Sequence, residues 1–418
     1  MILGLSIEAW ITIGTVLGVF LTLLFTKVKA EIAFFTAMAV LCITGVLEFE
    51  DSFKGLDSSS VLLVGVLFTV IAGLRYAGAL EWIVSHLMGQ PKNHAMALIR
   101  LMVPVGLLSS FMSNTATTAL FQNVVKIWSK KLNVSPSKLL IPLAYAASFG
   151  GLLTLIGTPP NLIISSQFAQ DTGVRLNLLA PLPVGLCVMI VSIIVVLLMR
   201  NFLPTRECPA DAGSAETESA KPNTRKTAIS LVILAAMLVA SSLKILPLTS
   251  CCLIAGILMV LTRCCTSEQA FQEVDWRVII IFAGSICLGT AIEKTGLDDL
   301  VVNHILGVSS NPIVVLCAIC VVSAILTEML SDTGCAAMFY PIAYQAATSL
   351  GVDPTPFVIA LMMSVSNSFA TPIATPPNMM VYAAGGYRFG DFARIGIPLK
   401  IVTLATAITV TLLIYPLK

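Results

Sequence analysis

Residues 157–161 read Gly-Thr-Pro-Pro-Asn, and residues 374–378 read Ala-Thr-Pro-Pro-Asn. Proline lacks a backbone N–H and its ring clashes with the preceding turn, so each Pro-Pro pair ends one helix, while the threonine before it is suited to cap the next. We therefore expect two broken helices in long apolar runs, at about 138–170 and about 355–387. The helix-breaking residues are Pro159, Pro160, Pro376 and Pro377.

A polar triplet also occurs once in each half of the chain. Ser113-Asn114-Thr115 returns 218 residues later as Ser331-Asp332-Thr333. Each triplet interrupts an apolar segment, at about 96–131 and about 312–350, and leaves arms shorter than the roughly 20 residues that cross a bilayer. We expect two re-entrant hairpins with the triplets at their tips. Breaks repeated at matching places are typical of transporters, where irregular backbone at membrane depth surrounds a buried site.

Composition indicates a polytopic membrane protein. The chain has 57% hydrophobic and 11% charged residues and a mean hydropathy of +0.95, whereas soluble proteins have roughly 25% charged residues. Its basic residues are scattered at the ends of apolar runs, which argues against a nucleic-acid partner. No catalytic triad or phosphate-binding loop is present, so we do not expect an enzyme. The unbroken candidate spans are about 6–27, 30–49, 60–75, 177–200, 227–246, 248–264, 277–292 and 393–415.

The repetition predicts the domain organisation. Residues 1–203 form the first repeat, 204–226 a flexible cytoplasmic linker, and 227–418 the second repeat. An odd number of crossings per half puts the halves in opposite orientations. The predicted fold class is an all-α polytopic membrane protein with an inverted-topology repeat, about ten transmembrane helices and two re-entrant hairpins.

The basic residues predict the orientation. With both termini outside, nineteen of the 24 Lys and Arg residues, Lys400 among them, face the cytoplasm, and five face the exterior. This distribution satisfies the positive-inside bias, and the reverse topology violates it. No basic segment precedes Glu8 at the start of the first apolar run, so we expect a retained span rather than a cleaved signal peptide.

The breaks predict the kind of ligand. Each of four helix starts, two at hairpin tips and two in broken helices, carries roughly half a positive charge, so together they suit a small dianion without any buried Lys or Arg. Unwound carbonyls and the nearby hydroxyl and amide oxygens are hard ligands of the kind that Na⁺ prefers. Cations bound there would offset the charge of the anion, which implies co-transport.

The paired motifs resemble those of the divalent anion/sodium symporter family. The resemblance rests on residues 113–120 (SNTATTAL), 157–163 (GTPPNLI), 331–333 and 374–380 (ATPPNMM), with further similarity at 385–392 (GGYRFGDF). It implies homodimeric elevator carriers of the cell membrane, each with a scaffold domain and a mobile transport domain. Such carriers move dicarboxylates, citrate or sulfate together with Na⁺.

The resemblance also implies the site residues. The sodium ligands would be Ser109, Ser113, Asn114 and Gly157 at one site, and Thr327, Leu330, Asp332 and Ala374 at the other. The anion would contact Asn114, Thr115, Thr158, Ser331, Asp332, Thr333, Thr375 and Pro376. The chain departs from the family pattern at Asp332, where dicarboxylate carriers have Asn, and it lacks one N-terminal span of those carriers.

Two acidic residues leave alternatives open. An ionised Asp332 would repel a dianion, so this residue either binds a cation or takes up a proton. Glu328, one helical turn earlier, is either an ion ligand or a tip carboxylate that faces water. The carboxyl of Asp332 keeps a sodium/proton antiporter or an arsenite-type permease as an alternative function. A channel fits less well, because oppositely facing tips suggest alternating access.

Overall fold

The computed structural model describes residues 6–26, 28–53, 59–78, 91–206, 224–242, 245–246, 248–274, 276–297, 311–328, 331–372 and 374–417. Every regular element in these ranges is a helix. The first half contains α1 (Ile7–Phe25), α2 (Ala30–Ile43), α3 (Phe49–Phe53), α4 (Ser59–Tyr76), α6 (His94–Ser109), α7 (Asn114–Leu132), α8 (Ser137–Gly151), α9 (Pro159–Thr172), α10 (Leu182–Leu198) and the short 3-10 helix η1 (Met199–Phe202). The second half contains α11 (Thr224–Ser242), α12 (Leu248–Leu261), α13 (Ser267–Gln272), α14 (Trp276–Lys294), α16 (Pro312–Leu326), α17 (Asp332–Ser349), α18 (Thr355–Val365), α19 (Pro376–Gly385) and α20 (Phe389–Ile414).

The helices begin and end close to the expected places. Both long apolar runs are broken: α8 stops at Gly151 and α9 starts at Pro159, while α18 stops at Val365 and α19 starts at Pro376. Pro159 and Pro376 each occupy the first helical turn, where their missing N–H has no intrahelical partner to lose. In chain order, α1–α4 and α6–α10 lie in the first half, and α11–α14 and α16–α20 lie in the second.

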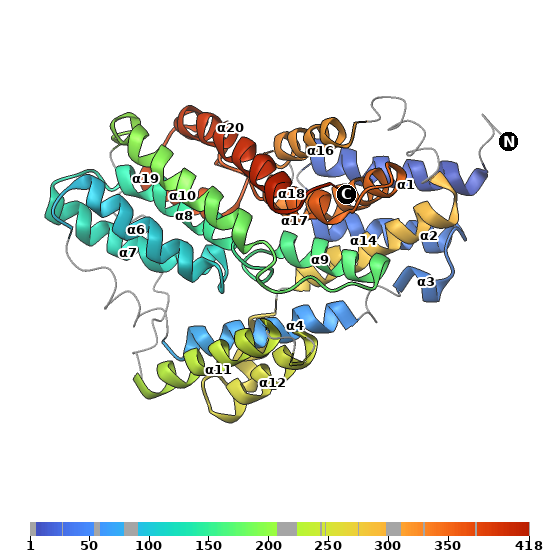
Figure 1. The fold of residues 1–418 in the computed structure, drawn as a ribbon, viewed down its shortest axis with the longest axis horizontal. Coiled ribbons are helices and arrows are strands. Elements are labelled where there is room, and N and C mark those ends of the chain that lie inside the picture. Colours follow the sequence, from blue (N-terminus) through green and yellow to red (C-terminus); the bar gives the residue numbers. More distant parts are fainter. Residues whose placement is uncertain are drawn as a thin grey trace.

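The two halves interlock through reciprocal contacts (Figure 1). Helix α4 packs on α12 of the other half, and α2 packs on α14. In the same way α9 packs on α17, and α19 packs on α7 and α8. Two spatial groups result, one of α1–α4 with α11–α14 and one of α6–α10 with α16–α20, and α14 contacts α9 and α17 between them. The two broken helices therefore belong to one group.

Apolar side chains cover much of the outer surface. Ile7, Leu198 and Leu413 are 77%, 74% and 76% exposed, on α1, α10 and α20. Within the described ranges, Leu182–Phe202 and Phe389–Ile414 are long and apolar enough to cross a membrane, and other apolar helices have 10–17 residues. Exposed apolar surface of this extent suits contact with lipid.

The start of the linker is fixed to both halves. Ser137 at the beginning of α8 donates its hydroxyl to the carbonyl of Pro204 at 2.8 Å. The guanidinium of Arg206 donates to both carboxylate oxygens of Asp391, at 2.9 and 2.7 Å. Tyr387, just before α20, donates its hydroxyl to the carbonyl of Ser137. The predicted linker thus begins on a defined surface, and its residues 207–223 lie outside the described ranges.

Candidate transport site

The first break, residues 152–158, is held by side chains that replace helix hydrogen bonds. Thr154 donates its hydroxyl to the carbonyl of Ser110 at the first hairpin tip. Asn161, in the first turn of α9, donates its amide to the carbonyls of Gly151 at 3.3 Å and Thr154 at 3.0 Å. These bonds fix the direction of the break and leave the N-terminus of α9 free to face a ligand.

The second break, residues 366–375, makes the same three bonds. Thr371 donates to the carbonyl of Glu328 at 3.0 Å. Asn378 donates its amide to the carbonyls of Ser368 at 3.0 Å and Thr371 at 3.1 Å. Ser368, Thr371 and Asn378 stand 217 positions after Gly151, Thr154 and Asn161, and Glu328 stands 218 positions after Ser110. The asparagines Asn161 and Asn378 were absent from the expected site residues, although both end a Pro-Pro-Asn triplet that marks them in the sequence.

Four buried polar atoms at the breaks have no hydrogen-bond partner among the described residues. They are Thr158 Oγ1, Asn161 Oδ1, Ser366 Oγ and Asn378 Oδ1, and these residues are at most 4% exposed. A buried polar group without a partner costs about 1–3 kcal/mol. A ligand that donates to or binds these oxygens would remove that cost, so their placement suits ion binding at the breaks.

Three residues of the first predicted cation site, Ser109, Asn114 and Gly157, lie close to Gly151 or to one another. Ser109 at the end of α6 donates its hydroxyl to Asn114 Oδ1 at 2.6 Å. A Cβ atom added to Gly151 would lie 2.9 Å from Asn114 Oδ1 and 2.3 Å from Thr158 Cγ2, and one added to Gly157 would lie 2.5 Å from the Gly151 carbonyl. The hairpin tip and the first break therefore touch.

Two further predicted residues of this half lie at the hairpin tip itself. Ser113 is the exposed residue before α7 and makes no side-chain cap. Thr115 is half-buried in the first turn of α7. Both are placed at a helix N-terminus, as the sequence indicated.

The second hairpin tip is capped by its own side chains. Ser331 accepts a hydrogen bond from the N–H of Gly334 at 3.1 Å. Asp332 Oδ1 accepts from the N–H of Thr333 at 2.8 Å and from its hydroxyl at 3.2 Å. The carboxylate of Asp332 thus lies at the start of α17, where the helix dipole favours a negative charge.

The other residues of the second predicted site lie along the second break. Thr327 donates to the carbonyl of Val365 at 2.7 Å and lies 3.1 Å from the hydroxyl oxygen of Ser368. Thr375 accepts from the N–H of Asn378 at 3.5 Å and caps α19. Ala374 is buried, Pro376 is exposed at the start of α19, and Leu330 lies outside the described residues.

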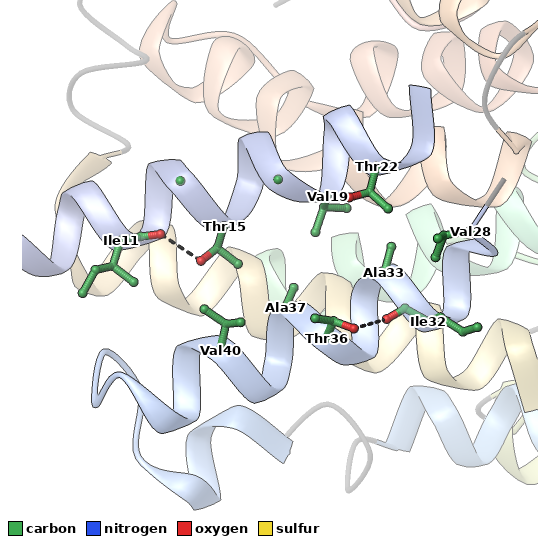
Figure 2. Close-up of a pocket in the computed structure, with 12 residues that line it drawn as sticks. Ile11, Thr15, Val19, Thr22, Val28, Ile32, Ala33, Thr36, Ala37 and Val40 are labelled. Carbon is green, nitrogen blue, oxygen red and sulfur yellow. Dashed lines mark hydrogen bonds between the residues drawn. The ribbon is translucent and has the colours of Figure 1, made fainter. Parts of the chain in front are cut away.

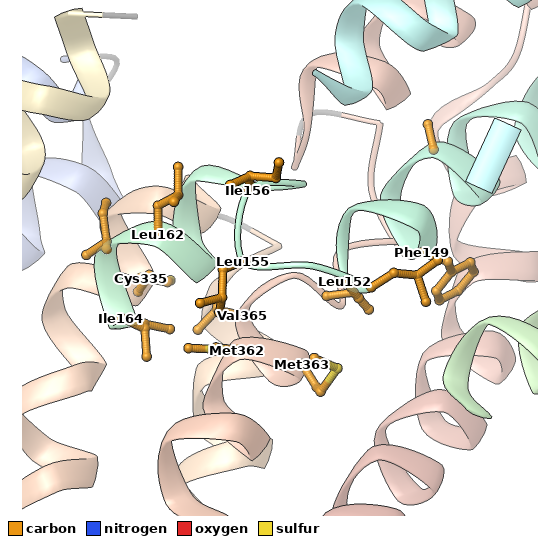
Figure 3. Packing of buried hydrophobic residues seen from close by; sticks show 14 of the residues in the cluster. Phe149, Leu152, Leu155, Ile156, Leu162, Ile164, Cys335, Met362, Met363 and Val365 are labelled. Atoms are coloured by element: carbon orange, nitrogen blue, oxygen red, sulfur yellow. The ribbon is translucent and has the colours of Figure 1, made fainter. Parts of the chain in front are cut away.

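The two breaks share one core. Tyr145 on α8 donates its hydroxyl to the carbonyl of Phe369 at 2.8 Å, and the ring of Phe149 lies 4.4 Å from that of Phe369. Figure 3 shows Leu155 of the first break among side chains of α17 and α18, with Val365 beside it. The first break therefore packs on the helix that precedes the second.

Glu328 does not face water at the tip, which corrects one of the two alternatives for this residue. The carboxylate is buried rather than exposed at the tip. Its Oε1 accepts from Lys400 Nζ at 2.6 Å and from the N–H groups of Phe369 and Ala370, each at 3.0 Å, and its Oε2 accepts from the N–H of Thr371 at 2.9 Å. Donors of the protein therefore contact both oxygens of this carboxylate, and it does not face water.

The expected location of Lys400 is wrong. It was assigned to the cytoplasmic face, but it lies buried within α20. Its ammonium donates to the Ala324 carbonyl as well as to Glu328. The expectation of no buried Lys or Arg is therefore wrong, although the pairing with Glu328 leaves the summed charge near the breaks unchanged.

A separate pocket of about 570 Å³ lies between α1 and α2 (Figure 2). The hydroxyls of Thr15 and Thr36 bond within their own helices, to the carbonyls of Ile11 and Ile32, each at 2.8 Å. The walls thus present mainly apolar groups. None of the predicted site residues lines this pocket.

Comparisons with known proteins agree with this architecture. An uncharacterised transporter of Synechocystis sp. is 24% identical over 90% of this chain and 92% of its own length. Sodium/sulfate cotransporter 2 of Chlamydomonas reinhardtii is 34% identical, over 36% of this chain and 17% of its own length. The crystal structure of the YdaH transporter of Alcanivorax borkumensis matches with a TM-score of 0.61 and 13% identity, over 98% of this chain and 97% of that one.

The family assignment rests on the greater part of the chain. The model of the citrate transporter family CitMHS matches residues 20–363 and 286–417. The relatives and the shared fold are those of transporters rather than enzymes. The chain belongs to the citrate transporter family CitMHS and is an integral membrane transporter of the ion transporter superfamily.

Proposed function

We propose that the protein is a secondary active transporter that couples the entry of a small divalent anion to a cation gradient, with Na⁺ as the coupling ion. The anion is a dicarboxylate, citrate or sulfate, and the carrier acts as in the divalent anion/sodium symporter family. The observation that carries the proposal is the matching pair of breaks, each followed by a helix that starts at a Pro-Pro pair and each with buried oxygens that have no partner among the described residues.

The proposal places the anion between the helix starts. The first residues of α9 and α19 follow Thr158 and Thr375, and the N-terminus of each helix carries about half a positive charge. Among the described residues near the breaks, one lysine is buried, and Glu328 neutralises its charge. The helix ends therefore supply the positive potential. Helix ends and hydroxyls accept both sulfate and carboxylates, so chemistry limits the substrate to small oxyanions.

Sodium is supported by the ligand types. Ser109 and Asn114 place oxygen atoms together beside the first break, and oxygen ligands without a charged partner suit a monovalent hard cation. The sulfate cotransporter that resembles this chain is named for sodium. We further propose a homodimer with an elevator motion, in which the group of α6–α10 and α16–α20 is mobile and both termini face the exterior.

Uptake into proteoliposomes tests the proposal. Labelled sulfate, succinate and citrate are each offered with an inward Na⁺ gradient, with choline in its place, and with arsenite as a competitor. We expect accumulation of one anion class that requires Na⁺. Sodium release coupled to proton entry without anion uptake would instead identify an antiporter, and arsenite flux without anion uptake would identify an arsenite-type permease.

Asp332 is expected to determine which cation is coupled. The residue lies at the tip where the dicarboxylate carriers have a neutral Asn, and it is half-buried. Asp332→Asn removes one negative charge. If the carboxylate binds the coupling cation, we expect anion uptake to depend less on the gradient of that cation. The measurement compares uptake under a Na⁺ gradient and, in Na⁺-free buffer, under a proton gradient. Identical coupling in the variant and the wild type would exclude a role for this carboxylate.

A further inference from the structure

The ion pair of Glu328 and Lys400 is the most completely bonded charged group near the breaks. Its side chains are 10% and 11% exposed. Glu328 joins the end of the second hairpin's first arm to three successive N–H groups of the second break. A buried carboxylate is stable only when paired and hydrogen-bonded, and here both conditions hold.

The first half lacks this arrangement. Ser110 occupies the position of Glu328, and its hydroxyl donates within the same turn to Leu107 at 2.6 Å. In the first break the matching N–H groups of Leu152 and Leu153 donate instead to the backbone carbonyls of Phe149 and Gly150, at 3.2 and 3.0 Å. A break of this kind therefore does not need a carboxylate in order to form. The ion pair must have a role that is specific to the second half.

The pair belongs to a seam between the second break and α20. Asn367 in the break donates its amide to the carbonyl of Lys400 at 3.2 Å and accepts from Thr403 at 3.0 Å. A Cβ atom on Gly396 of α20 would lie 2.0 Å from the carbonyl of Phe369, so the backbones are in direct contact. The ion pair is the charged part of this seam.

We propose that Glu328 and Lys400 are positioning residues that lock the second break onto α20 and so fix the ligands of the second cation site. Thr327 stands next to Glu328 and bonds to Val365 and Ser368 of the same region. Separating the charges would leave each one buried and unpaired, which is strongly unfavourable. The pair therefore holds the second site in place before a cation arrives.

This inference rests on the proposed function only in naming Na⁺ as the cation. Its structural part is measured separately, by alkylation of Cys335 with N-ethylmaleimide in the purified full-length protein. Cys335 is fully buried in the first turn of α17. In Glu328→Gln and Lys400→Met we expect Cys335 to react about tenfold faster, because one buried charge loses its partner. The same variants should need about tenfold more Na⁺ for half-maximal uptake, while the KM for the anion at saturating Na⁺ changes little.

Three further variants keep the test decisive. Lys400→Arg retains the charge and should keep Cys335 protected, and Ser110→Ala, at the matching position of the first half, should leave both measurements unchanged. The double variant Glu328→Gln/Lys400→Met should perturb Cys335 less than the two single effects combined, because no charge is left unpaired.

Accelerated alkylation in the single variants supports the lock even when the wild type shows no Na⁺-driven uptake, and that result would count against the proposed function alone. Single variants that elute as folded protein and keep the Cys335 reactivity and sodium dependence of the wild type would overturn the lock.

Discussion

Gly151→Ala is expected to abolish anion uptake, with a loss of more than about a hundredfold, because even a misplacement of 1 Å in a functional site costs about that factor. The new methyl group would lie 2.3 Å from Thr158 Cγ2 and 2.9 Å from Asn114 Oδ1. Contacts so short force the first break away from the hairpin tip. Initial rates in proteoliposomes, normalised to the amount of folded protein, measure the effect.

Gly289→Ala is the matched control for this substitution. Gly289 lies in α14, where an added Cβ meets no atom within 4 Å, so uptake should remain at the wild-type rate. Full activity of Gly151→Ala would mean that the first break and the tip do not need to touch for transport.

Asn378→Asp is expected to cause the second large loss. The amide of Asn378 donates to two carbonyls of the second break, and a carboxylate there would present an acceptor to two acceptors. Each unsatisfied buried group costs about 1–3 kcal/mol, and the buried charge adds to that cost. We expect uptake to fall by more than about a hundredfold and the unfolding temperature in detergent to drop, and Asn161→Asp should behave in the same way at the first break.

Asn177→Asp provides the control for the change from amide to carboxylate. Within the described ranges, the side chain of Asn177 makes one hydrogen bond: its Oδ1 accepts from the N–H of Leu179 at 3.4 Å in an exposed loop. Aspartate keeps that acceptor. Wild-type uptake by Asn378→Asp would show that the amide bonds do not hold the break.

The helices and their interruptions were predictable because their causes are local. A Pro-Pro pair ends a helix whatever surrounds it, and α9 and α19 begin at Pro159 and Pro376 as expected. The grouping of Ser109 and Asn114 with the first break was also anticipated, since tip residues and breaks of one half lie in neighbouring segments. The inverted orientation of the halves remains a prediction of the charge distribution.

The bonds between distant segments were not predictable from a single sequence. Glu328 and Lys400 are separated by 72 residues. The sequence around a lysine in an apolar run is the same whether its ammonium lies at the membrane interface or is buried within the protein. The reciprocal packing of α9 on α17 and of α19 on α7 likewise depends on how the halves fold together. Only the asparagines after the proline pairs carried a local signal that could have been used.

The central claim is that the two breaks form one anion site. It is tested most directly by an experimental density map of the full-length protein with saturating Na⁺ and the anion that competes best for uptake. The account predicts a single anion density that contacts the starts of both α9 and α19, near Thr158 and Thr375. Anion density at one break alone, or outside the group of α6–α10 and α16–α20, would contradict it.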